Sequence, residues 1–319
     1  MKAVISSDYH IGINPRHKKH TIDLHNSIKY IVDYAIKIKS DCFLILGDML
    51  HRPNISSDDL FFLRDIFQEL FINNIKVYCT LGNHDSSKEP VSKVFDTLVT
   101  FIDRNNYIKN GLVLDTFLLL PYLYKEDKFP ETKGKVLCLH QIIEGSVVNP
   151  NITAIPLHGS SRFFTKKEIK ENSPSMVFSG DIHHHHSFKI DTIPIHYIGT
   201  PSVLNWGETE YKNGFYHFED GKCKYVTIPQ RKWTTLTEPP KEIDKEAVYR
   251  LFLSPEHAET YKKIPPEQIS SFIMRKNEKP IKYDFSYIEL DEISCLRLWL
   301  KHKKLGNEEE HIKMHKELT

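Results

Sequence analysis

Five short segments place carboxylate, amide or imidazole side chains directly after strand-like apolar runs. The segments are Asp8-Tyr9-His10, Gly47-Asp48, Gly82-Asn83-His84-Asp85, His140, and Gly180-Asp181-Ile182-His183. In open α/β sheets, ligands gather at the carboxyl ends of strands. Each segment alone has an ordinary structural explanation, since a single histidine after a strand is common and Gly-Asn-His-Asp forms a good turn. Five such segments, each closing an apolar run, indicate one shared site.

The donor types in these segments indicate hard or intermediate metal ions. Carboxylate and amide oxygens mixed with imidazole nitrogens suit Mn, Fe or Zn, and no thiolate takes part. Two ions about 3.5–4 Å apart that share a carboxylate serve as a clamp for in-line attack on phosphorus. The sequence therefore predicts a two-metal site for the hydrolysis of phosphoesters, and it gives a reason for part of the unusual count of 18 histidines.

The elements that must position these side chains alternate through the first half of the chain. We expect strands over 2–6, 42–46 and 76–80. We expect three helices: one over 24–38, one that begins after an N-cap at Ser56 or Ser57, and one over 91–101. This β-α-β-α-β order predicts a buried parallel sheet with helices on its faces. From about residue 107 the strand-like runs follow closely, which suggests antiparallel pairing with a tight turn at 219–222. Residues 141–165 have no clear period and predict a long loop.

The composition excludes several classes of protein. The chain has 319 residues, a formal net charge of +1, and cysteines at 42, 79, 138, 223 and 295 without C-x-x-C spacing. Such a cysteine pattern excludes a disulfide framework and a thiolate zinc site. No apolar stretch reaches about 18 residues and the N-terminus turns polar early, so we expect a cytoplasmic protein without a membrane span. The near-zero charge argues against a polybasic coat for nucleic acid, but not against a local DNA site.

The order D-x-H, GD, GNHD, H and G-x-x-H resembles the calcineurin-like metallophosphoesterase superfamily. The fuller strings SSDYHIG, GDMLHRP, LGNHD and YIGTPSVLNWGE…NGFYHFEDG resemble the SbcD-type nucleases of double-strand-break repair, most of all the recombination endonuclease subunits of T-even-like phages. The resemblance covers roughly residues 1–230. It implies an α/β fold in which a two-sheet mixed sandwich is flanked by helices, with a small C-terminal α+β cap and a helical end.

The same resemblance implies two sets of metal ligands that share one carboxylate. These are Asp8, His10 and His183 on one metal, Asn83, His140 and Asp181 on the other, and Asp48 as the bridge. Position 181 departs from the family, whose fifth motif is usually G-H-x-H. A carboxylate can replace imidazole as a ligand, and its extra negative charge favours harder ions such as Mn. We therefore expect two divalent ions, preferably Mn, with Mg, Fe or Zn as alternatives.

Three further residues receive roles in catalysis from the resemblance. His84 would act as general acid or stabilise the transition state by protonating the leaving 3′ oxygen, and Asp85 would orient it. His51 matches a position that contacts the DNA phosphate, although simple exposure in the 51–55 loop is an alternative. Arg52 and Arg162 are candidates for contacts with the DNA backbone, and a solvated surface role is the alternative for both.

The chain is expected to contain three parts. Residues 1–235 would form the metallophosphoesterase core, 240–290 a reduced capping domain, and 291–319 a helical segment that binds a partner. Residues 291–304 carry an amphipathic pattern, which fits either a groove on an SbcC-type coiled-coil ATPase or simple packing on the cap.

These features lead to a main hypothesis and two alternatives. The main hypothesis is a two-metal DNA nuclease, a 3′→5′ exonuclease and endonuclease on DNA ends, which acts in double-strand-break repair or recombination as a homodimer with an SbcC-type ATPase. The first alternative is a stand-alone phosphodiesterase on nucleotides or small phosphoesters. The second is a weakly catalytic subunit that tethers its partner to DNA.

Overall fold

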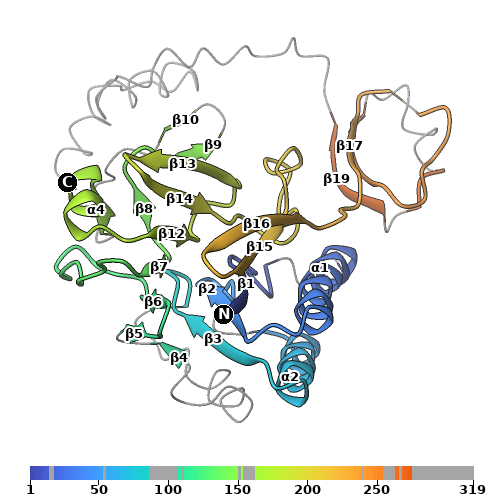
Figure 1. The fold of residues 1–319 in the computed structure, drawn as a ribbon. Coiled ribbons are helices and arrows are strands. Elements are labelled where there is room, and N and C mark those ends of the chain that lie inside the picture. Colours follow the sequence, from blue (N-terminus) through green and yellow to red (C-terminus); the bar gives the residue numbers. More distant parts are fainter. Residues whose placement is uncertain are drawn as a thin grey trace, which may run out of the picture. The chain divides into compact units, whose positions relative to one another are not determined.

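The computed structural model describes residues 1–13, 18–52, 55–85, 107–108, 111–149, 152–153, 162–238, 240–253, 263–265 and 268–274 (Figure 1). The described residues up to Ile273 belong to one compact unit. The helices expected over 91–101 and 291–304 lie outside the described residues. The domain boundaries near 235–240 and 290 stay predictions.

The first sheet is mixed and has six strands in the order β16-β15-β1-β2-β3-β4. Its strands are β1 (Lys2–Ser6), β2 (Cys42–Leu46), β3 (Lys76–Thr80), β4 (Tyr107–Ile108), β15 (Gly214–Glu219) and β16 (Lys222–Thr227). β1, β2, β3 and β4 pair in parallel, as the alternating pattern predicts. β15 and β16 add antiparallel strands at one edge. The tight turn predicted at 219–222 joins them, and Glu219 pairs with Lys222.

The second sheet also has six strands, in the order β13-β14-β12-β7-β6-β5. Its strands are β5 (Leu112–Val113), β6 (Phe117–Leu119), β7 (Val136–Leu139), β12 (Met176–Ser179), β13 (His186–Ile190) and β14 (Ile193–Tyr197). The expected antiparallel pairing is wrong for its centre, because β6, β7, β12 and β14 pair in parallel. Close spacing in sequence does not determine direction here, since β7 and β12 are joined by a long crossover that contains α4 (Lys166–Asn172).

The two sheets form a sandwich because alternate residues of each strand face opposite sides. Ala3 and Ile5 of β1 pack into a cluster that also contains Phe117 and Phe178 of the second sheet. Val4, between them, faces a cluster formed with the helices α1 (Lys18–Lys37) and α2 (Ser57–Ile72). Figure 1 shows these two helices on the side of β1–β3. The fold class expected from the sequence is therefore confirmed.

Helix α2 begins where the sequence predicts. Ser56 is its N-cap, and the Ser56 side chain accepts a hydrogen bond from the backbone N–H of Asp59. Helix α1 starts at Lys18, earlier than the expected residue 24. The apolar period becomes regular only from Leu24, so the polar first turns could not be recognised by periodicity.

The segment expected to be a long loop contains short strands. They are β8 (Ile142–Ile143), β9 (Val147–Asn149), β10 (Ile152–Thr153) and β11 (Phe163–Phe164), arranged as two two-stranded sheets. Runs of two or three residues are too short to show a period, which explains why the sequence predicts a loop there.

A separate three-stranded sheet follows the sandwich. It contains β17 (Trp233–Leu236), β18 (Val248–Leu253) and β19 (Ile269–Met274) in the order β17-β18-β19. Its small core includes Tyr249, Leu251 and Ile264. None of the described helices is long and apolar enough to cross a membrane.

Candidate metal centre

The five segments singled out in the sequence meet at the carboxyl ends of parallel strands. Asp8 follows β1, Asp48 follows β2, and Asn83 follows β3 in the first sheet, while His140 follows β7 and Asp181 follows β12 in the second. Parallel strands end at the same edge of a sheet, so residues far apart in sequence converge there. Among the described residues, three groups have ligand atoms that all lie within 4.8 Å of one another: Asp8, His10 and His183; Asp8, Asp48 and His140; and His10, His51 and His84.

The first group joins Asp8, His10 and His183. The Nε2 atoms of His10 and His183 lie 3.0 Å apart. Asp8 is fully buried, and its Oδ2 atom has no hydrogen-bond partner among the described residues. A buried, unpartnered carboxylate oxygen is costly, so its presence beside two imidazole nitrogens indicates a cation site.

The second group joins Asp8, Asp48 and His140, and Asn83 lies beside it. The Nε2 atom of His140 lies 3.0 Å from Oδ1 of Asn83 and 3.5 Å from Oδ2 of Asp48. The other ring nitrogen of His140, Nδ1, lies 2.7 Å from the carbonyl oxygen of Leu46, to which it donates. This hydrogen bond sets the tautomer and leaves the Nε2 lone pair available to a metal.

Asp48 stands between the two groups. Its Oδ2 atom lies 3.4 Å from Nε2 of His10 and 3.5 Å from Nε2 of His140. Its Oδ1 atom accepts a hydrogen bond of 2.9 Å from the backbone N–H of His84, which fixes the carboxylate. One carboxylate oxygen is therefore within reach of ligands from both groups, as a bridging residue requires.

Asp181 lies at the edge of the second group. Its Oδ1 atom is 3.9 Å from Nε2 of His140, and its backbone N–H donates to Oδ1 of Asp8 at 3.2 Å. Its role as a ligand stays a prediction.

Burial and neighbouring charges shift the pKa values of the candidate ligands. Burial raises the pKa of Asp8, and it raises the pKa of Asp181 to about 6. The pKa of Asp48 lies below its usual range, because His140 and His10 outweigh the effect of burial. The pKa of His140 is raised because Asp48 and Asp8 outweigh burial, which alone would lower it. Several buried acids that compete for positive charge are the usual environment of divalent metals.

The backbone of the site is strained where the ligands stand. The φ angles of Asp8, His10, Asp48 and Asp181 are 54°, 47°, 50° and 77°, all in the left-handed region. This region is rare for non-glycine residues and costs roughly 1–3 kcal/mol each. Such strain clusters at functional sites, where the surrounding structure holds it.

Two glycines of the motifs are required by close packing. A Cβ atom on Gly82 would lie 2.1 Å from Oδ1 of Asp48, and one on Gly47 would lie 2.3 Å from Nδ1 of His140. Gly47 also has a φ of +79°. Any side chain at either position would displace a candidate ligand.

His84 and His51 lie at the mouth of the site. The His84 side chain is 37% exposed, and its Nε2 atom is 4.0 Å from Oδ2 of Asp48. Nδ1 of His84 lies 3.0 Å from the backbone oxygen of His51, and the two rings stack at 5.1 Å. Nδ1 of His51 in turn faces Nδ1 of His10 at 3.4 Å. Both histidines therefore lie next to the candidate ligands, on the side that solvent reaches.

The structure corrects the place predicted for Asp85. Its carboxylate accepts hydrogen bonds from the backbone N–H groups of Gly82, Met49 and Leu50, at 3.0, 3.3 and 3.2 Å. It does not orient the His84 ring, whose Nδ1 meets a backbone carbonyl instead. The reason is geometric: Asp85 is buried beneath the turn and ties the loop after β3 to the loop after β2.

The two candidate arginines have different surroundings. Arg52 is exposed and donates to the carbonyl of Gly12 at 3.2 Å. Arg162 forms an ion pair with Glu168, and its guanidinium lies 5.3 Å from the centre of the Phe164 ring. The charge of Arg162 is thus paired within the protein. A role of either residue in binding substrate stays a prediction.

Glu208 is a site residue that the sequence patterns do not reveal. Its Oε1 atom lies 2.9 Å from Nδ1 of His183, and its side chain is only 6% exposed. Glu208 belongs to the string GTPSVLNWGE, which carries part of the family resemblance but no predicted role at this position. A single acid in a turn carries no periodic signal, so its partner could be found only in the folded chain.

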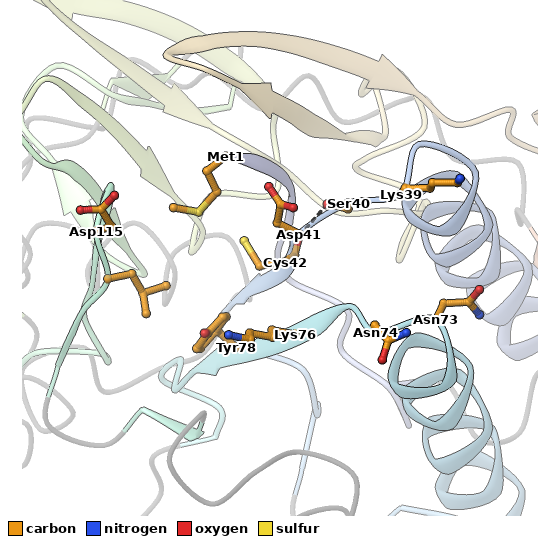
Figure 2. Close-up of a pocket in the computed structure, with 11 residues that line it drawn as sticks. Met1, Lys39, Ser40, Asp41, Cys42, Asn73, Asn74, Lys76, Tyr78 and Asp115 are labelled. Carbon is orange, nitrogen blue, oxygen red and sulfur yellow. Dashed lines mark hydrogen bonds between the residues drawn. The ribbon is translucent and has the colours of Figure 1, made fainter.

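A pocket of about 540 Å³ lies away from this site (Figure 2). Its lining includes Asp41, Cys42, Lys76 and Tyr78, which lie at or near the amino ends of β2 and β3. The candidate ligands stand at the opposite, carboxyl ends of these strands. The pocket contains none of the residues predicted to act in catalysis.

Two comparisons of the sequence find related proteins. Residues 1–185, which include all five segments, match the family described as calcineurin-like phosphoesterase. The chain is 29% identical over 168 residues to the DNA double-strand break repair protein Mre11 of Methanocaldococcus jannaschii. That match covers 44% of this chain and 43% of the relative, so the chain spans less than half of that protein's length.

Solved structures with a similar arrangement include two proteins of low identity. One is a protein of Thermus thermophilus, with 11% identity and a TM-score of 0.44, covering 71% of this chain and 98% of the other. The second is a dimetal phosphatase from Danio rerio, with 10% identity and a TM-score of 0.44, covering 68% of this chain and 91% of the other.

Proposed function

Because the chain belongs to the calcineurin-like phosphoesterase family, we propose that this metal-dependent phosphoesterase is a nuclease that hydrolyses DNA phosphodiesters with two metal ions. The observation that carries the proposal is the position of Asp48. Its Oδ2 atom lies within 3.5 Å of imidazole nitrogens from two separate ligand groups. A carboxylate in that position suits a pair of ions rather than one.

We assign the ligands as the family pattern and the donor chemistry suggest. One ion would be held by Asp8, His10 and His183. The second ion would be held by Asn83, His140 and Asp181, and Asp48 would be a ligand of both. When bound, the two ions would supply Lewis acidity and orient the phosphoester for in-line attack. The oxygen-rich donor set with Asp181 favours Mn, with Mg, Fe or Zn as alternatives.

The histidines at the mouth would handle protons and the phosphate. Nδ1 of His84 can donate to the His51 carbonyl, which directs Nε2 toward Asp48 and the reaction space. A protonated Nε2 would then give its proton to the leaving 3′ oxygen. His51, stacked on His84, would donate to a phosphate oxygen of the DNA.

The choice of DNA as substrate rests on the relative and on the sequence strings. The relative is named for the repair of DNA double-strand breaks. We propose 3′→5′ exonuclease and endonuclease activity on DNA ends, in a homodimer that works with an SbcC-type coiled-coil ATPase. Arg52, exposed near His51, would contribute to backbone binding.

A gel assay with two kinds of substrate tests this function. Linear duplex DNA labelled at the 3′ or the 5′ end is incubated with the full chain and Mn²⁺ or Mg²⁺, beside a chromogenic phosphodiester. The Asp48→Ala variant serves as a control for contaminating nucleases. We expect release of the 3′ label first, with Mn²⁺ and not with the control variant.

Two outcomes would reject the nuclease. Turnover of the small ester with untouched DNA would favour the stand-alone phosphodiesterase. Binding of DNA without turnover of either substrate would favour the tethering subunit. The ATPase partnership is tested by adding an SbcC-type protein and measuring co-elution and the change in DNA cleavage.

A further inference from the structure

Glu208 holds a position that no catalytic step uses but that faces a candidate ligand directly. Its Oε1 atom lies 2.9 Å from Nδ1 of His183, and the opposite nitrogen of that ring, Nε2, lies 3.0 Å from Nε2 of His10. An ionised carboxylate only accepts hydrogen bonds, so Nδ1 of His183 must donate. The lone pair of the ring is thereby placed on Nε2, the nitrogen that faces His10 and that would bind a metal ion.

Among the described residues, the hydrogen-bond partners given for the Glu208 carboxylate are donors. Besides His183, the Nδ2 atom of Asn205 donates to Oε1, and the backbone N–H of Leu204 donates to Oε2 at 3.1 Å. Both oxygens are therefore engaged, and the side chain is almost fully buried. A buried carboxylate with its partners in place is held in one orientation, and it holds the imidazole in turn.

The turn that carries Glu208 is anchored on the three-stranded sheet. Trp206, two residues earlier, packs edge to face on Trp233 of β17 with ring centres 4.8 Å apart. The guanidinium of Arg250 in β18 lies 4.6 Å from the centre of the Trp206 ring. Glu208 therefore sits on a turn that the neighbouring sheet supports rather than on a free loop.

We propose that Glu208 is the positioning residue of the metal centre: it holds His183 in the tautomer and orientation that bind the metal. This inference rests on the proposed function, since it needs His183 as a ligand. A carboxylate behind a ligating histidine typically contributes 10- to 100-fold to metal affinity, about the size of effect expected here.

The replacement Glu208→Gln is a sharp probe because it changes one group only. The Gln amide has the same shape, but one of its two ends is an N–H₂ donor. Whichever way it turns, that end faces a donor, either the Leu204 N–H or the pair formed by His183 and Asn205. The exposed Glu210, two residues further, provides the matched control Glu210→Gln.

The experiment titrates Mn²⁺ into the metal-free full chain by calorimetry and measures hydrolysis at rising Mn²⁺. For Glu208→Gln we expect roughly 10- to 100-fold weaker binding at one of two sites, with hydrolysis restored by excess Mn²⁺. Glu210→Gln should match the wild type. Unchanged affinity in Glu208→Gln, or activity that excess Mn²⁺ does not restore, would overturn the inference.

A further variant separates this inference from the proposed function. His183→Ala should remove one Mn²⁺ site entirely. If His183→Ala lowers the number of sites while Glu208→Gln has no effect, only the role of Glu208 fails. If His183→Ala itself leaves Mn²⁺ binding unchanged, the ligand assignment fails, and the role of Glu208 fails with it. Thermal unfolding without metal, compared among all four proteins, shows that each variant folds.

Discussion

The Nε2 atoms of His10 and His183 lie 3.0 Å apart although 173 positions separate the two residues in sequence. The Nδ1 atom of each ring already faces another side chain, His51 at 3.4 Å and Glu208 at 2.9 Å. Two nitrogens that point at each other beside the unpartnered Oδ2 of Asp8 need a cation or a shared proton between them.

Replacement of His183 should affect metal binding, whereas replacement of its neighbour should not. His183→Ala removes a nitrogen from the first group, so we expect loss of one Mn²⁺ site and of phosphodiester hydrolysis. The ring of His184 instead packs near Tyr211, with centres 4.8 Å apart, so His184→Ala should keep both. Calorimetric Mn²⁺ titration and a chromogenic ester measure these effects. Loss of activity in His184→Ala alone would place the ligand one residue later.

Replacements of Asp48 and His84 should have different effects on metal binding and on proton transfer. Asp48→Ala removes the oxygen that lies near both His10 and His140, so Mn²⁺ binding should be lost together with activity. His84→Ala should leave Mn²⁺ binding unchanged and lower turnover by roughly 10²- to 10⁴-fold, as expected for a general acid. The pair is compared by metal titration and by steady-state rates. Weak Mn²⁺ binding in His84→Ala would assign that residue to the ligands instead.

Asp85 should contribute to stability rather than to the protonation of His84. Asp85→Ala leaves three buried backbone N–H groups without their acceptor, at a cost of about 1 kcal/mol or more each. We expect the free energy of unfolding to fall by roughly 3 kcal/mol or more, and by less in Asp85→Asn, which keeps one acceptor oxygen. Urea denaturation of the metal-free protein measures the loss. A large fall in turnover in Asp85→Asn without a loss of stability would restore the orienting role.

The contact between His25 of α1 and Asp59 of α2 should increase the free energy of unfolding at neutral pH but not at acidic pH. Burial tends to raise the pKa of Asp59, but hydrogen bonds from His25 and Ser56 outweigh it, so the pKa lies below its usual value. A carboxyl whose folded pKa is depressed stabilises the fold above its unfolded pKa of about 3.9 and loses that effect as the pH falls through the folded value. The stability difference between the wild type and Asp59→Asn should therefore shrink below about pH 4.

Asp58 provides the control for this pH dependence. It is exposed in the same first turn of α2, so Asp58→Asn should show no comparable change with pH. Denaturant unfolding at several pH values between about 3 and 7, which bracket the ordinary carboxyl range, measures both variants. A constant difference between the wild type and Asp59→Asn over that range would contradict the prediction.

The first sheet and the positions of the candidate ligands could be predicted because their signals are local. Apolar runs such as Cys42–Leu46 are long enough to be read as buried strands, and each is followed within a few residues by a polar motif. Parallel strands bring their carboxyl ends together, so Asp8, Asp48 and Asn83 could be expected at one edge from their places in the chain alone. The donor types then indicate a metal and the hydrolysis of phosphoesters.

Other features depend on contacts that no local sequence pattern predicts. The parallel direction of β7 and β12 follows from a crossover, and the sequence pattern of buried strands is the same in either direction. Asp85 looks like a partner of its neighbour His84, but the fold turns it toward the backbone of Met49 and Leu50.

By itself the sequence therefore determined which residue types follow which strands, and with them the family and the chemistry. Only the tertiary structure decided which atoms meet: Glu208 behind His183, Asp85 beneath its turn, and the oxygen of Asp48 between two imidazoles. The reason is physical. Strand and helix periods come from neighbours in the chain, whereas a hydrogen bond to a ligand depends on distances of a few ångströms between segments that are brought together only when the sheets pack.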